Sequence, residues 1–145
     1  MTKSKGYELA KSASLNSDFY KCHTGAVAIY GNKVLAIGWN SEKLSSMQAR
    51  YNTRTRGFDG HKYKSSIHAE MMVVNKIKYL DIDFSQVRIF VWRGQTTPML
   101  SKPCKACEKA MRDLGIKKVF YTGANSYISE IYNWKFVDFD FTFYK

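Results

Sequence analysis

Acidic side chains are scarce in this sequence, which has 12 Asp and Glu against 23 Lys and Arg and a formal net charge of +11 over 145 residues. A field of this sign raises the local concentration of anionic ligands, whether they are nucleotides, nucleic acid or lipid headgroups. Charges scattered over a surface also keep a protein soluble, which is the plainer interpretation. The charge therefore predicts an anionic partner without identifying it.

Long hydrophobic runs are missing too. Residues 1–6 have no apolar core of signal-peptide length, and no stretch approaches the roughly 20 residues of a membrane span. No repeat, low-complexity tract or Pro/Gly-rich linker divides the chain, and it has only two prolines. We therefore expect a soluble, cytoplasmic protein with a single domain over residues 1–145.

Cysteine is equally rare, with Cys22, Cys104 and Cys107 as its only three positions. An odd number of thiols in a reducing compartment argues against a disulfide framework. The close spacing of Cys104 and Cys107 instead indicates metal or redox chemistry.

Hydrophobic periodicity and turn residues predict alternating strands and helices. Gly31-Asn32 is a hairpin signal between two apolar runs, and Pro103 and Gly115 bracket a helix. The helices are expected at 4–14, at 68–80 with Ser65 or Ser66 as N-cap, and at 103–114; the strands at 25–30, 34–39, 87–92, 118–122 and 137–143. This order predicts an α/β fold with two or three layers.

The polar stretch 40–64 is expected to be a long loop rich in basic residues. A loop of this length in a compact domain is usually functional or disordered. It carries Arg50, Arg54 and Arg56, whose guanidinium forks suit phosphate. A solvated loop is the plainer alternative for each of them.

Two short motifs carry the chemistry: His68-Ala69-Glu70 and Pro103-Cys104-Lys105-Ala106-Cys107, each at an expected helix start. The first is common by chance and the second is not, so their combination is the signal. Thiols three residues apart on a first helical turn point the same way and can bind one metal ion. The helix N-terminus also favours their thiolate forms.

Two thiolates and one imidazole suit zinc, so His68, Cys104 and Cys107 are predicted ligands of Zn²⁺. Three protein ligands leave a fourth position for water, as in catalytic sites, and zinc lowers the pKa of that water to make hydroxide available. Glu70 would then move protons from the water to the base and to the departing ammonia.

Each of these residues also fits a role without catalysis. A structural zinc site would need a fourth protein ligand, for which Cys22, His23 and His61 are the candidates. A redox Cys-x-x-Cys pair lacks its usual thioredoxin-like context. Glu70 could be no more than a favourable charge at a helix N-terminus.

The two motifs, in this order, resemble the signature of the cytidine and deoxycytidylate deaminase superfamily of zinc enzymes. Further blocks resemble it over about residues 21–122: Gly25-Ala26-Val27-Ala28, Ile37-Gly38-Trp39-Asn40, Ser66 to Glu70, Ser101 to Cys107, and Leu114 to Tyr121.

The resemblance implies a three-layer α-β-α fold with a central mixed five-stranded sheet. It also implies the same three zinc ligands and the same proton shuttle, Glu70. Asn40 matches a family asparagine that contacts the sugar hydroxyl, and Ala26 and Ala69 match positions whose backbone binds the pyrimidine. Members of this family commonly form oligomers such as hexamers, so a homo-oligomer is expected.

The Gly-Trp-Asn block and the long insert are similar to deoxycytidylate deaminases, which implies hydrolysis of dCMP to dUMP, with dCTP as an alternative substrate. The chain departs from that pattern in having Lys102 before Pro103, and it has no recognisable nucleotide effector motif. A polynucleotide cytosine deaminase, a nucleoside or free-base deaminase, and a zinc-stabilised module without activity remain the competing hypotheses.

Overall fold

The computed structural model describes residues 1–19, 22–56, 66–94, 98–99, 101, 103–123 and 131–135. Four α-helices lie within these ranges: α1 (Lys3–Ser14), α2 (Ser46–Arg56), α3 (Ala69–Ile77) and α4 (Lys105–Leu114). The strands there are β1 (His23–Tyr30), β2 (Lys33–Trp39), β3 (Val87–Gly94), β4 (Pro98–Met99), β5 (Lys118–Thr122) and β6 (Ile131–Lys135), and the short 3-10 helix η2 (Phe84–Gln86) precedes β3. None of the described helices is long and apolar enough to cross a membrane.

The sheet is mixed. It contains six described strands, one more than the five expected: five follow the order β2-β1-β3-β5-β6, and the two-residue β4 pairs with the end of β3. The β3–β5 pair is parallel and is joined through α4, whereas β1 pairs antiparallel with both β2 and β3. Parallel neighbours need such a crossover, so α4 is held across the sheet directly after the Cys104 segment.

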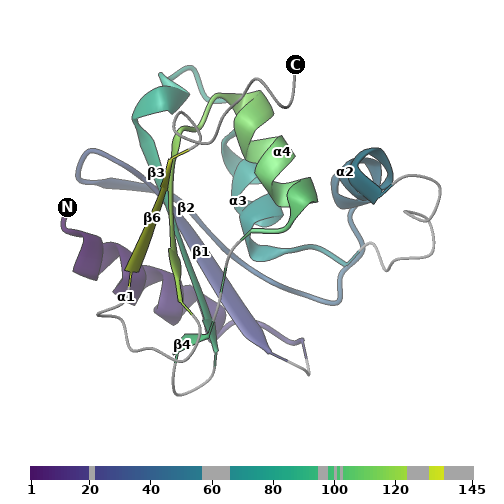
Figure 1. The fold of residues 1–145 in the computed structure, drawn as a ribbon, viewed down its shortest axis with the longest axis horizontal. Helices are drawn as coiled ribbons and strands as arrows, with labels where there is room; N and C mark the ends of the chain where they lie inside the picture. The colour runs from purple at the N-terminus through teal and green to yellow at the C-terminus, as the bar shows by residue number, and fades with distance from the viewer. Residues whose placement is uncertain are drawn as a thin grey trace.

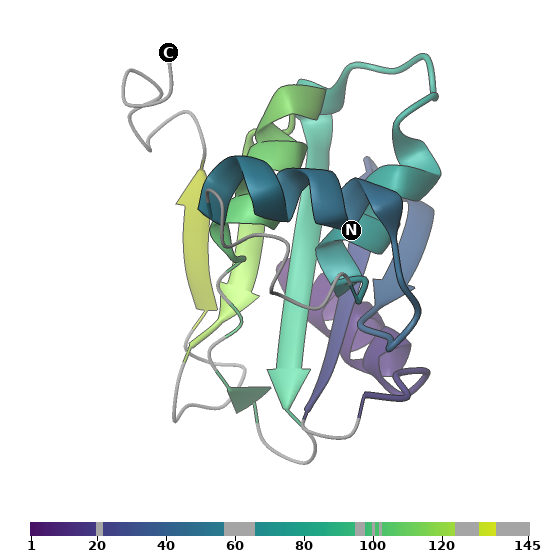
Figure 2. The same ribbon diagram turned by 90° about the vertical axis from the view of Figure 1, so that its right-hand side faces the viewer.

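Helices cover both faces of the sheet, which confirms the predicted α/β fold with a mixed sheet between helical layers (Figure 1). Strand alternation divides the apolar side chains: Val27 and Ile29 of β1 pack under α1, while Ala26 and Ala28 face the layer of α3 and α4. Strand β3 is buried on both faces, as a central strand should be. Helix α2 lies outside α3 and α4 (Figure 2).

Two glycines let helices approach the sheet closely. A Cβ on Gly38 of β2 would lie 2.4 Å from the carbonyl oxygen of Ala69, and one on Gly25 of β1 would lie 1.9 Å from that of Ala10. Only a residue without a side chain allows this approach. Gly38 thus brings the first turn of α3, and with it the His68-Ala69-Glu70 motif, against the sheet.

Helix α2 corrects the expectation of a loop over 40–64. Its inward face carries buried amides, Gln48 and Asn52, joined by a hydrogen bond of 3.0 Å from Gln48 Nε2 to Asn52 Oδ1. Hydrophobic periodicity does not detect a helix that buries polar side chains. The available local signal was Ser45, whose hydroxyl accepts a hydrogen bond from the Gln48 amide in the manner of an N-cap.

The start of α3 also differs from the prediction. Its N-cap is His68 rather than Ser65 or Ser66, because Ser66 is extended and forms a β-bridge with Leu44; Ser65 lies outside the described residues. Pro103 similarly precedes the N-cap of α4, Cys104, instead of lying in the first turn. The predicted strand 137–143 lies outside the described residues, and the described strand that pairs with β5 is β6.

Candidate metal centre

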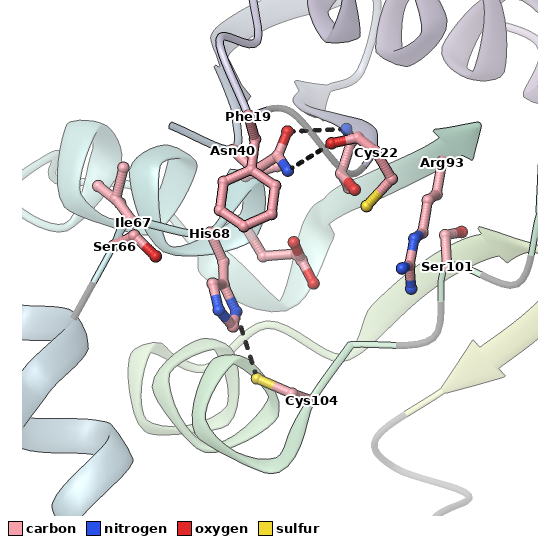
Figure 3. A pocket seen from close by; sticks show the side chains of 12 residues that line it. Phe19, Cys22, Asn40, Ser66, Ile67, His68, Arg93, Ser101 and Cys104 are labelled. Carbon is pink, nitrogen blue, oxygen red and sulfur yellow. Dashed lines mark hydrogen bonds between the residues drawn. The ribbon is translucent and has the colours of Figure 1, made fainter. Parts of the chain in front are cut away.

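Two helix starts meet on the α3–α4 side of the sheet. His68 is the N-cap of α3 and Cys104 the N-cap of α4, and neither side chain caps its own helix. Both residues have the extended backbone that is usual at an N-cap position. Figure 3 shows the His68 imidazole and the Cys104 sulfur facing one another across this gap.

The three predicted ligands form one cluster. The Nδ1 atom of His68 lies 3.5 Å from Cys104 Sγ and 3.4 Å from Cys107 Sγ, and the ligand atoms all lie within 4.8 Å of one another. Tetrahedral zinc, with bonds of about 2.3 Å to sulfur and about 2.0–2.1 Å to nitrogen, holds such atoms about 3.6 Å apart. The donor set and its spacing therefore fit Zn²⁺.

No fourth protein ligand joins the cluster within the described ranges. Cys22 and His23 are described and are not part of it, while His61 lies outside the described residues. Neither Cys22 nor His23 therefore supplies the fourth protein ligand that a structural zinc site would need. Three protein ligands would leave a bound zinc ion one coordination position for water, which is typical of catalytic zinc.

The two thiols affect each other's pKa in opposite directions. A hydrogen bond from the Cys107 thiol, assisted by His68, lowers the pKa of Cys104 to about 3 against the opposing effect of burial. The same hydrogen bond, together with burial, raises the pKa of Cys107 well above its ordinary value. The lowered pKa of Cys104 favours its thiolate form, which is the form that binds a metal ion.

Glu70 lies in the first turn of α3, is 6% exposed, and lines the same cavity. Burial raises the pKa of its carboxyl group to about 7, with Cys104 raising it further and His68 and Arg93 opposing the rise. A carboxyl group that titrates near neutral pH can both accept and release a proton at little cost. This is the property that a proton shuttle requires.

The cluster lies at the wall of a cavity of about 230 Å³. Twelve residues from separate parts of the chain line it: Phe19, Cys22, Thr24, Asn40, Ser66, Ile67, His68, Ala69, Glu70, Arg93, Ser101 and Cys104. The cavity is thus assembled from the α1–β1 connection, the ends of β1, β2 and β3, and the starts of α3 and α4.

Asn40 has a structural task in this wall. Its Oδ1 accepts hydrogen bonds from the Thr24 amide (2.8 Å) and the Ser17 hydroxyl (2.6 Å), and its Nδ2 donates to the Cys22 carbonyl (2.9 Å). The side chain therefore joins the end of β2 to the chain that enters β1. One amide hydrogen of Asn40 remains beyond these bonds, so contact with a sugar hydroxyl stays a prediction.

The other predicted substrate-binding residues are placed differently. Ala69 lines the cavity, whereas Ala26 is buried in β1 and does not line it. Arg50 is exposed on α2 and is likewise not among the lining residues. Arg54 and Arg56 belong to the same helix. A role in binding substrate remains a prediction for all of them.

Two positioning residues lie outside the set that the sequence predicted. The Ser101 hydroxyl donates to the Val91 carbonyl and accepts from the Thr122 amide (2.7 Å), which fixes the segment leading to Cys104 between β3 and β5. Gln48 Oε1 accepts a hydrogen bond of 3.1 Å from the His68 amide. Ser101 stands next to the cysteine motif, but nothing local to Gln48 indicates that it contacts a residue 20 positions away.

Comparison with known proteins places this geometry in a class. The sequence profile described as "Cytidine and deoxycytidylate deaminase zinc-binding region" matches residues 1–123. Among curated protein sequences, none matches this chain.

Similar folds occur in solved structures. A cytidine deaminase from Burkholderia pseudomallei is 19% identical, with 95% of both chains covered and a TM-score of 0.63. A cytidine deaminase mutant from Mycobacterium tuberculosis is 13% identical, covering 96% of this chain and 94% of that one, with a TM-score of 0.61. The dCMP deaminase of cyanophage S-TIM5, in complex with dCMP and dUMP, is 23% identical, covering 86% and 85%, with a TM-score of 0.52.

The fold, together with a cluster of one imidazole and two cysteine sulfurs beside a buried carboxyl group, defines a zinc-dependent deaminase domain. The chain belongs to the cytidine and deoxycytidylate deaminase family, whose zinc-binding region it carries over most of its length.

Proposed function

We propose that this protein deaminates a cytosine nucleotide hydrolytically, with dCMP as substrate and dUMP and ammonia as products. The observation that carries the proposal is the cluster of His68, Cys104 and Cys107, of which His68 and Cys104 line the same cavity as Glu70. A zinc-stabilised module without activity would have no use for a buried carboxyl group beside the metal cluster.

The residues have separate tasks in this reaction. His68, Cys104 and Cys107 hold the zinc ion, which when bound supplies the Lewis-acid chemistry that makes water a nucleophile near neutral pH. Glu70 accepts a proton from the attacking water, delivers it to the ring nitrogen of the base, and then assists the departure of ammonia. Its pKa of about 7 supports this exchange in both directions.

Other residues that line the cavity would bind the base and the sugar. Ala69 would offer its backbone to the pyrimidine, and Asn40 would use its remaining amide hydrogen for a sugar hydroxyl. Phe19 presents an aromatic ring to the same cavity, as Figure 3 shows, and aromatic faces stack favourably on bases.

A phosphorylated substrate is favoured over a nucleoside by the excess of positive charge. The Gly38-Trp39-Asn40 block supports the same choice through its similarity to deoxycytidylate deaminases. The net charge of +11 would equally suit single-stranded nucleic acid, which makes polynucleotide deamination the second candidate.

One panel of substrates tests the proposal. Zinc-loaded protein is incubated with deoxycytidine, cytidine, dCMP, dCTP and a short cytosine-containing oligonucleotide, and both ammonia release and loss of cytosine absorbance are followed. We expect the highest kcat/KM with dCMP. Turnover of the oligonucleotide alone would select the second candidate, and zinc-loaded protein that turns over no substrate would overturn the proposal.

We also propose that the protein is a cytoplasmic homo-oligomer. Light scattering of the purified protein would measure its mass in solution, and a mass of one 16.8 kDa chain would contradict an oligomer.

A further inference from the structure

Arg93 is the cationic side chain among those described as lining the cavity, and beyond the effect of its charge on the pKa of Glu70 it has no role in the proposed chemistry. We propose that Arg93 is the anion-recognising residue of this site and that its guanidinium binds the phosphate monoester of the substrate. This inference rests on the proposed function and adds to it the group that distinguishes a nucleotide from a nucleoside.

The fold delivers Arg93 to the cavity through strand register. Arg93 lies near the end of β3 and pairs with Thr24 of β1, which also lines the cavity. Figure 3 shows its side chain extending from the strand into the pocket, on the side of Cys22 and Ser101. The residue is half-buried, so its charge is partly removed from bulk water.

Among the described residues, the Arg93 guanidinium has no carboxylate in an ion pair with it, although its charge acts on Glu70. The Arg93 Nε atom is buried without a hydrogen-bond acceptor. Glu70, the acidic residue among those described as lining the cavity, makes no ion pair with Arg93. A buried donor without an acceptor is costly, and a bound anion would remove that cost.

Arg88, five residues earlier on the same strand, provides the contrast. Its guanidinium donates to the carbonyl oxygens of Met1 (2.8 Å) and Gly31 (3.5 Å), so its donors are used within the fold. Arg93 faces the cavity instead and has no comparable acceptor among the described residues. The difference indicates that the acceptor for Arg93 comes from a ligand.

Phosphate fits this donor set better than the alternatives. A guanidinium offers a planar fork that forms paired, charge-assisted hydrogen bonds to two oxygens of a phosphate. A nucleoside offers only neutral hydroxyl groups there. The rival candidate among the described side chains is Arg50, which is exposed on α2 and does not line the cavity.

The test compares substrates with and without the phosphate. We measure kcat/KM for dCMP and for deoxycytidine with the zinc-loaded wild type, Arg93→Gln, Arg93→Lys and Arg50→Gln. The charge control is Lys33→Gln, at the exposed β1–β2 turn, which lies at the opposite end of β1 from Thr24. The ratio of the two kcat/KM values isolates recognition of the phosphate.

We expect Arg93→Gln to lower the dCMP-to-deoxycytidine ratio by about 10- to 100-fold, the usual effect of losing a hydrogen bond to a charged group. Arg93→Lys should recover part of the ratio, because it restores the charge without the fork. Lys33→Gln should leave the ratio unchanged, since it removes the same net charge far from the cavity.

Two results would overturn the inference. An equal loss of kcat/KM with both substrates in Arg93→Gln would mean that Arg93 positions the site and does not bind phosphate. A lower dCMP-to-deoxycytidine ratio in Arg50→Gln, with no change in Arg93→Gln, would mean that Arg50 of α2 binds the phosphate. If the wild type turns over neither substrate, the proposed function fails. The role of Arg93 in binding phosphate is then tested separately, by measuring ligand affinities with calorimetry. Wild type should then bind dUMP more tightly than deoxyuridine, and Arg93→Gln should lose that preference; equal preferences in both proteins would contradict the inference.

Discussion

Glu70 illustrates at the scale of one residue how burial creates reactivity. The same carboxyl group on the exposed face of α3 would be ionised at neutral pH and would contribute only to helix stability. Placed at 6% exposure beside His68 and Cys104, it titrates at about pH 7. Desolvation, the largest of the influences on it, thus converts an ordinary acid into one suited to proton transfer.

Replacing Glu70 should separate chemistry from metal binding. Glu70→Gln keeps the size of the side chain and is not a ligand change, so we expect unchanged zinc content and a fall in kcat of about 10²–10⁴-fold or more. Elemental analysis and steady-state kinetics measure the two quantities. Glu8→Gln, an exposed replacement on α1, is the matched control and should alter neither. Activity retained in Glu70→Gln would remove the assigned role.

At the scale of elements, the positions of the zinc ligands depend on contacts between helices that are distant in sequence. Gln48 of α2 accepts the amide hydrogen of His68 and is itself oriented by Asn52. The side chain of Tyr51 donates to Asp113 of α4 at 3.0 Å, so α2 also contacts the helix that carries Cys107. Helix α2 thereby contacts both the N-cap residue of α3 and helix α4.

Removing the Gln48 side chain should weaken zinc binding, although Gln48 is not one of the predicted zinc ligands. In Gln48→Ala the His68 amide and the Asn52 side chain lose a buried partner, and we expect zinc affinity to fall by about 10- to 100-fold. Competition with a fluorescent chelator measures the affinity. Gln86→Ala, at an exposed position in η2, should leave it unchanged; an unchanged affinity in both variants would contradict the role of α2.

Gly38 tests the approach of α3 to the sheet. In Gly38→Ala the new methyl group would lie 2.4 Å from the Ala69 carbonyl oxygen and 2.9 Å from Val73 Cγ2, so the first turn of α3 must shift. We expect a loss of about 1–3 kcal/mol in the free energy of unfolding, together with weaker zinc binding.

Urea titration of the zinc-loaded protein measures the loss. Gly31→Ala is the control, because Gly31 has a left-handed φ of 63° but no neighbour within 4 Å of a new Cβ. It should cost about 1 kcal/mol through backbone strain and leave zinc affinity unchanged. Gly38→Ala with full zinc affinity would mean that α3 tolerates the shift.

For the whole molecule, the metal centre links the start of α3 to the start of α4, which do not belong to the sheet. His68 and Cys104 belong to different helices and are 36 positions apart. A zinc ion bound to both would stabilise the folded state by the free energy of its binding, because the unfolded chain does not preform the site.

Metal removal should therefore lower stability and activity together. Chelation is expected to reduce the melting temperature by several degrees and abolish turnover, and added Zn²⁺ should restore both. Calorimetry with and without chelator measures the shift. Cys104→Ser should behave as the metal-free protein, whereas Cys22→Ser, outside the cluster, should retain one zinc per chain. Loss of zinc in Cys22→Ser would indicate a fourth ligand.

The spacing of apolar residues and the residues typical of turns were sufficient to predict most of the described helices and strands. The cluster of His68, Cys104 and Cys107 was predicted because two motifs occur together in the order of the deaminase signature, although 36 positions separate His68 from Cys104. Strands β1, β2, β3 and β5, helices α1, α3 and α4, and each motif by itself follow from periodicity and from residues that are near neighbours in the chain. Such features depend on a few consecutive residues, so the sequence states them directly.

Contacts between distant segments could not be predicted in this way. The contact of Gln48 with His68, the position of Arg93 opposite Thr24, and the inclusion of Phe19 in the cavity wall depend on register and packing across the whole sheet. Helix α2 was not predicted because its fully buried side chains, among those described, are the amides Gln48 and Asn52, while Met47 and Tyr51, which pack against the core, are too few to give a helical periodicity. The sequence by itself determined the two ligand motifs, since the residues within each are near neighbours in the chain. Only the tertiary structure decided that the two motifs meet at one cavity beside Arg93, since helix packing and strand pairing bring these distant positions together.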